Sequence, residues 1–105
     1  MIGLLALAAA SVSSASLEGA QRAYNVCVRR MAVRLEPSGD SPDDIARAAQ
    51  TLCPTERFAA LNAAVAAGGS AVDDTERAAK FYAAAEATIA RLCRKTKDCI
   101  NTGLR

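Results

Sequence analysis

The sequence predicts an all-α fold, a small antiparallel bundle of three to four helices stapled by two disulfides. Apolar residues recur at steps of three and four through most of the chain, which is the spacing of an amphipathic helix. No stretch alternates apolar and polar residues with the β-branched enrichment of a strand. Four cysteines and no histidine follow an N-terminal segment typical of exported proteins, and in an oxidising compartment such cysteines pair.

Residues 1–15 have the features of a signal peptide. Residues 2–10 form a short apolar run, and Ser13, Ser14 and Ala15 are the small residues that signal peptidases favour. We expect cleavage after Ala15 and a single helical domain at 16–105. The segment lacks Lys and Arg, so the alternatives are a buried helix of the mature protein and a true start further upstream. A retained membrane anchor is a weaker alternative, because a spanning helix needs about 20 apolar residues.

The first helix of the domain is predicted from Ser16, its N-cap, to Leu35. Its apolar stripe consists of residues at steps of three and four: Leu17, Ala20, Tyr24, Cys27, Met31 and Leu35. The helix should end before Pro37, because the residue that precedes a proline avoids the helical region.

The second helix has the strongest start signal in the chain. Ser41 is a good N-cap, Pro42 suits the first helical position, and Asp44 follows three residues after the cap. Its expected buried face is Ile45, Ala48, Ala49 and Leu52. Pro54 should end this helix, because a proline inside a helix removes a hydrogen bond and clashes with the preceding turn.

The apolar phase changes at Pro54, so a third helix with a new orientation is expected to about Ala67. Phe58, Leu61 and Val65 form its expected inner face, and Gly68-Gly69 ends it. Ser70 is the expected cap of a fourth and longest helix, from about Ala71 to Lys95. The expected inner face of this helix is Ala78, Phe81, Ala85, Ile89 and Leu92.

The cysteines are expected to pair as Cys27–Cys53 and Cys93–Cys99. In an antiparallel hairpin Cys27 lies opposite about Gln50, so Cys53 is within roughly 4.5 Å of helix rise. Cys93 and Cys99 can pair only if the last helix ends by about Lys95 and the tail folds back. Cross-pairings between the hairpin and the last helix are the alternative, since four cysteines allow three connectivities.

The cysteine spacing argues against a metal or redox role. The gaps between successive cysteines are 25, 39 and 5 residues, which does not match the paired C-x-x-C clusters of structural zinc sites. A C-x-x-C redox motif and a C-x-x-C-H haem motif are also missing from the sequence. We therefore expect no cofactor and no metal.

The charges are segregated along a chain whose formal net charge is only +2. Acids cluster at the starts of the second and fourth helices and bases at the ends of the first and fourth, which the helix dipole by itself favours. A functional interpretation is a basic surface formed by Arg29, Arg30, Arg34, Arg91, Arg94, Lys95 and Lys97. Such a surface would meet an acidic protein or an anionic envelope surface. Nucleic acid is not an expected partner, because the net charge is small and aromatic platforms are missing.

The sequence contains no motif that specifies a reaction. Histidine, the commonest general base, does not occur, and neither a nucleophile elbow nor a glycine-rich phosphate loop is present. We expect a non-enzymatic binding or envelope-interaction protein, periplasmic or secreted, without a stable membrane span after cleavage. The alternative is a small-ligand carrier or minor enzyme with a pocket between helices.

Overall fold

The computed structural model describes the backbone of residues 2–97 and the side chains of residues 17–97. This part of the chain forms four α-helices and no strand, which confirms the all-α prediction. The helices are α1 (Ile2–Leu35), α2 (Pro42–Thr51), α3 (Pro54–Ala66) and α4 (Val72–Thr96), and a short 3₁₀ turn, η1 (Glu36–Ser38), follows α1.

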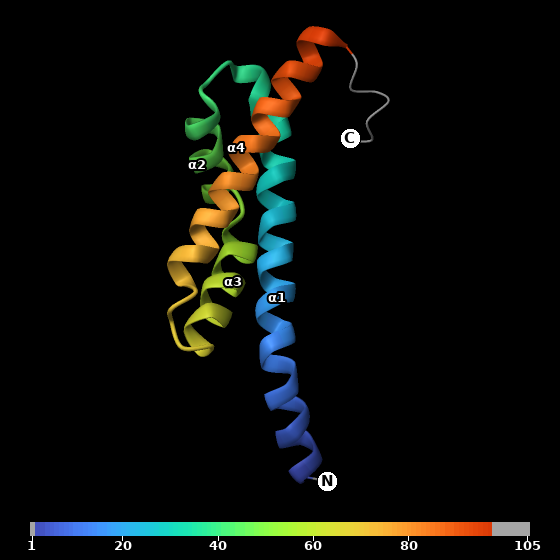
Figure 1. Ribbon diagram of the computed structural model, residues 1–105, viewed down its shortest axis with the longest axis vertical. Helices are drawn as coiled ribbons and strands as arrows, with labels where there is room; N and C mark the ends of the chain where they lie inside the picture. Colours follow the sequence, from blue (N-terminus) through green and yellow to red (C-terminus); the bar gives the residue numbers. More distant parts are fainter. Residues whose placement is uncertain (1, 98–105) are drawn as a thin grey trace.

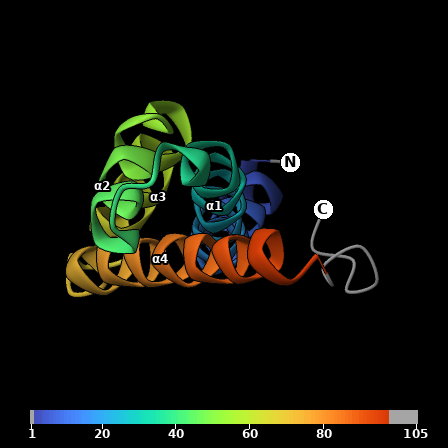
Figure 2. The same ribbon diagram turned by 90° about the horizontal axis from the view of Figure 1, so that it is seen from above.

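The helices form a bundle in which α2 and α3 together make one broken antiparallel partner of α1 (Figure 1). The chain turns again at Gly68 and Gly69, so α4 runs parallel to α1. Side chains of α1 and of η1, which follows it, bond side chains of α4 in the same chain order, in the pairs Gln21–Thr75, Arg29–Glu86 and Glu36–Arg91. Seen from above, α4 lies along one side of the bundle, while α2 and α3 lie across from it beside α1 (Figure 2).

The predicted start of the first helix is wrong, because α1 begins at Ile2 rather than at Ser16. Residues 2–15 are rich in leucine and alanine, which are strong helix formers, so the helix continues through the expected cleavage site. A continuous helix is compatible with a precursor as well as with an uncleaved chain. Export and cleavage therefore stay predictions.

The predicted boundaries around α2 and α3 are confirmed. The Ser41 hydroxyl accepts a hydrogen bond of 3.1 Å from the backbone N–H of Asp44, which caps α2. The helix breaks between Thr51 and Pro54, and Cys53 occupies the junction in a non-helical conformation. Gly68 and Gly69 both adopt positive φ, which only glycine reaches without strain, and they end α3.

The predicted cap of the fourth helix is wrong. Ala71 occupies the N-cap position of α4, and no side chain caps the helix there. Asp73 and Asp74 in its first turn still provide the negative charge that the N-terminal end of the helix dipole favours.

The core of the bundle is built mainly from alanine. Ala60 and Ala64 of α3 and Ala79, Ala83 and Ala87 of α4 are fully buried. The larger core side chains are Tyr24 and Val28 of α1, Ile45 of α2 and Cys53 at the junction. Ala20, Cys27, Met31 and Leu35, which the predicted α1 stripe includes, are partly buried against this core.

The predicted inner faces of the third and fourth helices are wrong, because most of their large side chains are exposed and the rest of each face is only partly buried. Phe58 and Val65 of α3 are 70% and 61% exposed, and Phe81 and Leu92 of α4 are 66% and 57% exposed. Leu52, the C-cap of α2, is also exposed, whereas Ala46 is buried in place of the predicted Ala48.

Close helix packing explains this inversion. Helices approach to the distance that the side chains at their contact allow, and alanine allows a shorter distance than the larger apolar residues do. The Cα atoms of Cys27 and Cys53 are only 6.1 Å apart, so the disulfide holds α1 close to the junction of α2 and α3. Phenylalanine and leucine do not fit into such narrow helix contacts, and these side chains lie on the outer faces instead.

Candidate functional site

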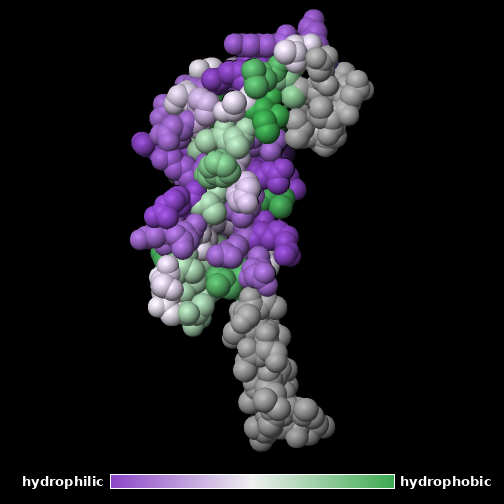
Figure 3. Space-filling model, in the orientation of Figure 1, coloured by the Kyte–Doolittle hydropathy of each residue, from purple (hydrophilic) through white to green (hydrophobic). Residues whose placement is uncertain are grey.

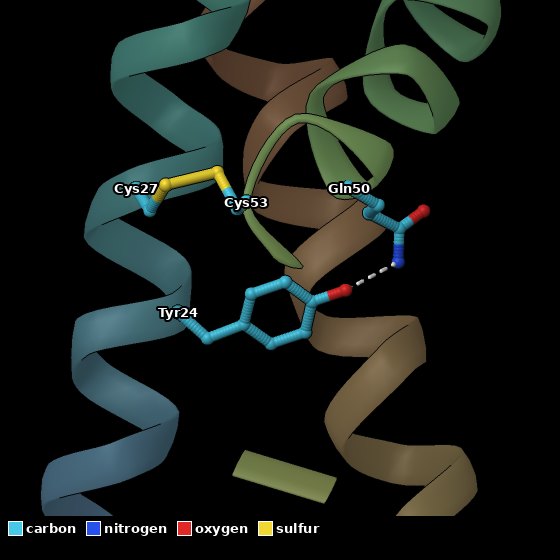
Figure 4. The surroundings of a disulfide bond; sticks show 4 residues. All are labelled: Tyr24, Cys27, Gln50 and Cys53. Atoms are coloured by element: carbon cyan, nitrogen blue, oxygen red, sulfur yellow. Dashed lines mark hydrogen bonds between the residues drawn. A yellow bond between two sulfur atoms is a disulfide. The ribbon is translucent and has the colours of Figure 1, made fainter. Parts of the chain in front are cut away.

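The predicted disulfide between Cys27 and Cys53 is present and joins α1 to the junction between α2 and α3 (Figure 4). Cys53 is fully buried and Cys27 partly buried, so the bond lies at the edge of the core. This bond excludes the alternative cross-pairings between the hairpin and the last helix. Cys93 lies near the end of α4, and its predicted partner Cys99 lies outside the described residues, so their pairing stays a prediction.

A polar network lies beside the disulfide, where α1, α2, α3 and α4 meet. The buried Tyr24 hydroxyl donates a hydrogen bond of 2.5 Å to Oε1 of Glu76. It accepts one of 3.2 Å from the Gln50 amide (Figure 4). Arg57 donates to the other oxygen of Glu76, Oε2, at 2.8 Å from Nε. The network thus connects all four helices through a single carboxylate.

Tyr24 and Glu76 keep fixed protonation states in this network. Burial, with the hydrogen bond to Glu76, raises the pKa of Tyr24 far above its ordinary value. Burial also acts to raise the pKa of Glu76, but hydrogen bonds from Arg57 and Tyr24 outweigh it and hold the pKa below its ordinary value. The tyrosine therefore stays neutral and the glutamate charged, and neither group is poised to exchange a proton near neutral pH.

A second buried carboxylate, Glu36, ties the end of α1 to the end of α4. Its side chain is 3% exposed and accepts hydrogen bonds from Arg91 at 3.1 Å and from Arg94 at 2.6 Å and 2.9 Å. Arg91 also donates to the backbone carbonyl of Asp40. Hydrogen bonding by Arg94, followed by that of Arg91, holds the pKa of Glu36 below its ordinary value.

The residues of the predicted basic surface therefore have different environments. Arg91 and Arg94 pair with Glu36, and Arg29 pairs with Glu86, a carboxylate that is only 7% exposed. The other four form no ion pair with a described residue and are exposed: Arg30, Arg34, Lys95 and Lys97. The sequence did not reveal that buried glutamates bind three of these arginines, because that depends on which helix ends meet.

Two rows of apolar side chains lie along the outside of the bundle, and the larger members of each row are mostly exposed. The α3 stripe consists of Pro54, Phe58, Leu61 and Val65, and the α4 stripe of Ala78, Phe81, Ala85, Ile89 and Leu92. Tyr82 lies beside the α4 stripe, with its ring edge-on to Phe81 at a centroid distance of 5.7 Å. Apolar side chains gather along α4 on the face drawn in Figure 3, with polar side chains on both sides.

The hollows on the described surface are shallow grooves. One groove follows the α3 stripe and is lined by Arg57 and Asn62 in addition to the stripe itself. Another lies between α1 and α4 and is lined mainly by polar residues, with Val26 and Tyr82 among them. Both are open to solvent, so they suit a docked chain segment better than an enclosed small ligand.

Residues 17–97 contain neither a metal-binding cluster nor a membrane-spanning helix. No three carboxylate or cysteine side chains in this range lie close enough together to hold a metal ion. Within the same described part of the chain, no helix combines the length and the apolar character that crossing a bilayer requires. The chain matches no protein-family model, and no curated protein or solved structure is significantly similar to it.

Proposed function

We propose that this protein is a small exported binding protein that acts without catalysis and docks another protein through the α3 stripe. The observation that carries the proposal is the inverted distribution of apolar side chains on α3 and α4: their alanines face the interior, and their large apolar side chains lie outside. A stable monomer gains nothing from exposing Phe58 and Val65 in one row, whereas contiguous exposed apolar side chains are typical of interaction sites.

Export is part of the proposal because of the apolar N-terminus and the disulfide. Structural disulfides persist in oxidising compartments, and Cys27–Cys53 has ordinary disulfide geometry with a Cα–Cα distance of 6.1 Å. Periplasmic or secreted location is the corresponding expectation. The exposed bases Arg30, Arg34, Lys95 and Lys97 lie near the C-terminal ends of α1 and α4, away from the α3 stripe, and they favour a partner that carries acidic groups.

The alternative function, a small-ligand carrier or minor enzyme, needs an enclosed pocket between helices with converging polar groups. The buried polar groups of the described residues are instead engaged with one another: Tyr24, Gln50 and Glu76 in one network and Glu36 with two arginines in another. The geometry therefore favours the binding protein.

The test is affinity capture from envelope extract with the oxidised protein and two variants. Phe58→Ser removes the centre of the α3 stripe, and Ala59→Ser is the matched control, because Ala59 is exposed on the same helix outside the stripe. We expect one protein to be recovered by the parent and by Ala59→Ser, and to be lost with Phe58→Ser. Recovery of the same proteins by all three, or of none by the parent, would contradict the proposal.

A further inference from the structure

The α4 stripe is bordered by polar side chains along both of its long sides (Figure 3). Arg77 lies four residues before Phe81, and both are exposed. Lys95 lies three residues after the exposed Leu92. At about 100° per residue, the two bases lie on one side of the stripe. Tyr82 lies on the other side, in a shallow groove that it shares with residues of α1.

The edge of the stripe on the α1 side is also basic. Arg22 and Arg29 line the shared groove, with the exposed Val26 between them. Arg30 follows Val26 by about one helical turn. Arg22 and Arg30 are exposed and form no ion pair with a described residue. The outer face of α1 thus adds arginines beside the apolar side chains of α4.

Negative charge is scarce on this face. Residues 19–35 of α1 contain no acid, and residues 77–97 contain one, Glu86. The Glu86 side chain is 7% exposed and pairs with Arg29 at 3.1 Å. Among the described residues, the exposed acids of α1 and α4 lie only near the N-terminal end of the face: Glu18, Asp73 and Asp74. Most of the face therefore presents apolar side chains between two rows of positive charge.

We infer that this face of α1 and α4 docks on the surface of a membrane that contains anionic phospholipid. Helices that lie in a membrane interface bury apolar side chains at the boundary between headgroups and acyl chains. Lys and Arg at their flanks bind the anionic headgroups. Phe81, Ile89 and Leu92 supply the apolar contact here, and the two basic edges supply the charge. Both helices lie in the plane of the membrane, so this contact requires no spanning helix.

Shape favours a bilayer over an acidic protein as the occupant. Protein partners are usually held by a few side chains that fill well-packed pockets. The grooves at Tyr82 and Phe81 are shallow and open to solvent, so they offer no such pocket. A bilayer needs only a broad apolar face with basic flanks. The inference goes beyond the proposed function, which rests on the α3 stripe, and each can fail without the other.

The first experiment measures binding of the oxidised protein, in the form its host produces, to lipid vesicles by co-sedimentation. Vesicles of equal parts phosphatidylglycerol and phosphatidylcholine should bind it at least about tenfold more tightly than vesicles of phosphatidylcholine alone. Equal binding to the two compositions, or no binding to either, would overturn the inference. Binding to immobilised polyglutamate as tight as to the mixed vesicles would also overturn it, because charge alone would then account for the attraction.

The second experiment reverses one charge on the face. Arg22→Glu should weaken binding to the mixed vesicles by at least about fivefold. Arg47→Glu is the matched control, because Arg47 is an exposed arginine on α2 with an acid, Asp43, four residues before it, as Glu18 precedes Arg22. The control should bind within about twofold of the parent. Equal losses in the two variants would show that net charge, and not this face, determines binding.

The third experiment locates the apolar contact, and the absence of tryptophan from the chain makes an introduced one a local probe. With mixed vesicles, the fluorescence emission of Phe81→Trp should shift to shorter wavelength, because the side chain enters a less polar environment. Phe58→Trp is the control, since Phe58 is similarly exposed but lies on α3. A shift in Phe81→Trp alone supports this face as the docking surface. No shift in Phe81→Trp, or an equal shift in both variants, would overturn it.

Discussion

Cys27 and Cys53 hold the point at which α1, α2 and α3 meet, so their bond should matter more than the pair expected in the tail. Replacing both with serine should lower the free energy of unfolding by roughly 2–5 kcal/mol, the usual cost of losing a disulfide in a small exported domain. The sequence separation is 26 residues, and a loop of that length gives about 3.5 kcal/mol in the chain-entropy model.

The matched comparison is the double variant Cys93→Ser with Cys99→Ser. This variant should lower the free energy of unfolding by less, because the loop that this pair would close is shorter and lies near a chain end. Urea unfolding of both double variants beside the oxidised parent gives the two values. A larger loss from the second pair would show that the tail is not peripheral.

Glu36 is the buried charge on which the junction of α1 and α4 depends. Its pKa lies below the ordinary value of 4.5, chiefly because Arg94 bonds the charged form. A group whose pKa is lowered on folding stabilises the protein above its unfolded pKa, and this stabilisation is lost as the pH falls through the folded pKa. The parent should therefore lose stability steadily below about pH 4.5.

Glu36→Gln should lower the free energy of unfolding by about 1–3 kcal/mol at neutral pH, since it removes charged hydrogen bonds. The difference from the parent should shrink as the pH falls below 4.5, because the parent's carboxylate is then protonated too. Glu56→Gln is the control, as Glu56 forms no ion pair with a described residue. Thermal unfolding at several pH values between neutral and acidic compares the stability of each variant with that of the parent. A difference between Glu36→Gln and the parent that does not change with pH would contradict the assigned role of Glu36.

At the scale of the helix, the caps of α2 and α4 offer a direct comparison. Ser41→Ala should destabilise the protein by about 1 kcal/mol, because the serine hydroxyl accepts the N–H of Asp44. Ser70→Ala should leave the free energy of unfolding nearly unchanged, because Ala71 occupies the N-cap position of α4 and no side chain forms a capping hydrogen bond there. Denaturant unfolding of the two variants checks the difference, and equal losses would mean that Ser70 contributes a contact the structure does not show.

The boundaries of α2 and α3 could be predicted from the sequence because they depend on local chemistry. Ser41 with Asp44, the proline at 54 and the glycines at 68 and 69 each act on the backbone of their own turn. The inner faces of α3 and α4 could not be predicted in this way. Both helices carry two apolar rows, one of alanine and one of large side chains, and helical spacing cannot decide which row is buried.

In the whole molecule, the closeness of helix packing decides which apolar row of α3 and α4 is buried, the alanine row or the row of large side chains. The same limit applies to Glu36 and Glu76, whose arginine partners come from α4 and α3 and could be identified only once the helix ends were placed. The disulfide Cys27–Cys53 was predictable because an antiparallel hairpin fixes that distance with little other information.

Export is a property of the whole chain and is tested on protein from its native host. The apolar run at 2–10 and the small residues before Ser16 predict a mature N-terminus at Ser16 or within a few residues of it. Mass spectrometry of the intact protein from the envelope or medium fraction gives that terminus. An intact Met1 in the cytosolic fraction would contradict export.

On α3 and α4, alanine faces the interior of the bundle and the large apolar side chains lie outside. The free energies of unfolding of two α4 variants give the sharpest check of this arrangement. Ala83 is fully buried and Phe81 is 66% exposed. In urea unfolding at low protein concentration, Ala83→Leu should lower the free energy of unfolding by about 1–3 kcal/mol through overpacking. Phe81→Ala should lose less than about 1 kcal/mol, as exposed positions do. The opposite order, with Phe81→Ala costing the roughly 3–5 kcal/mol typical of a buried phenylalanine, would contradict the account.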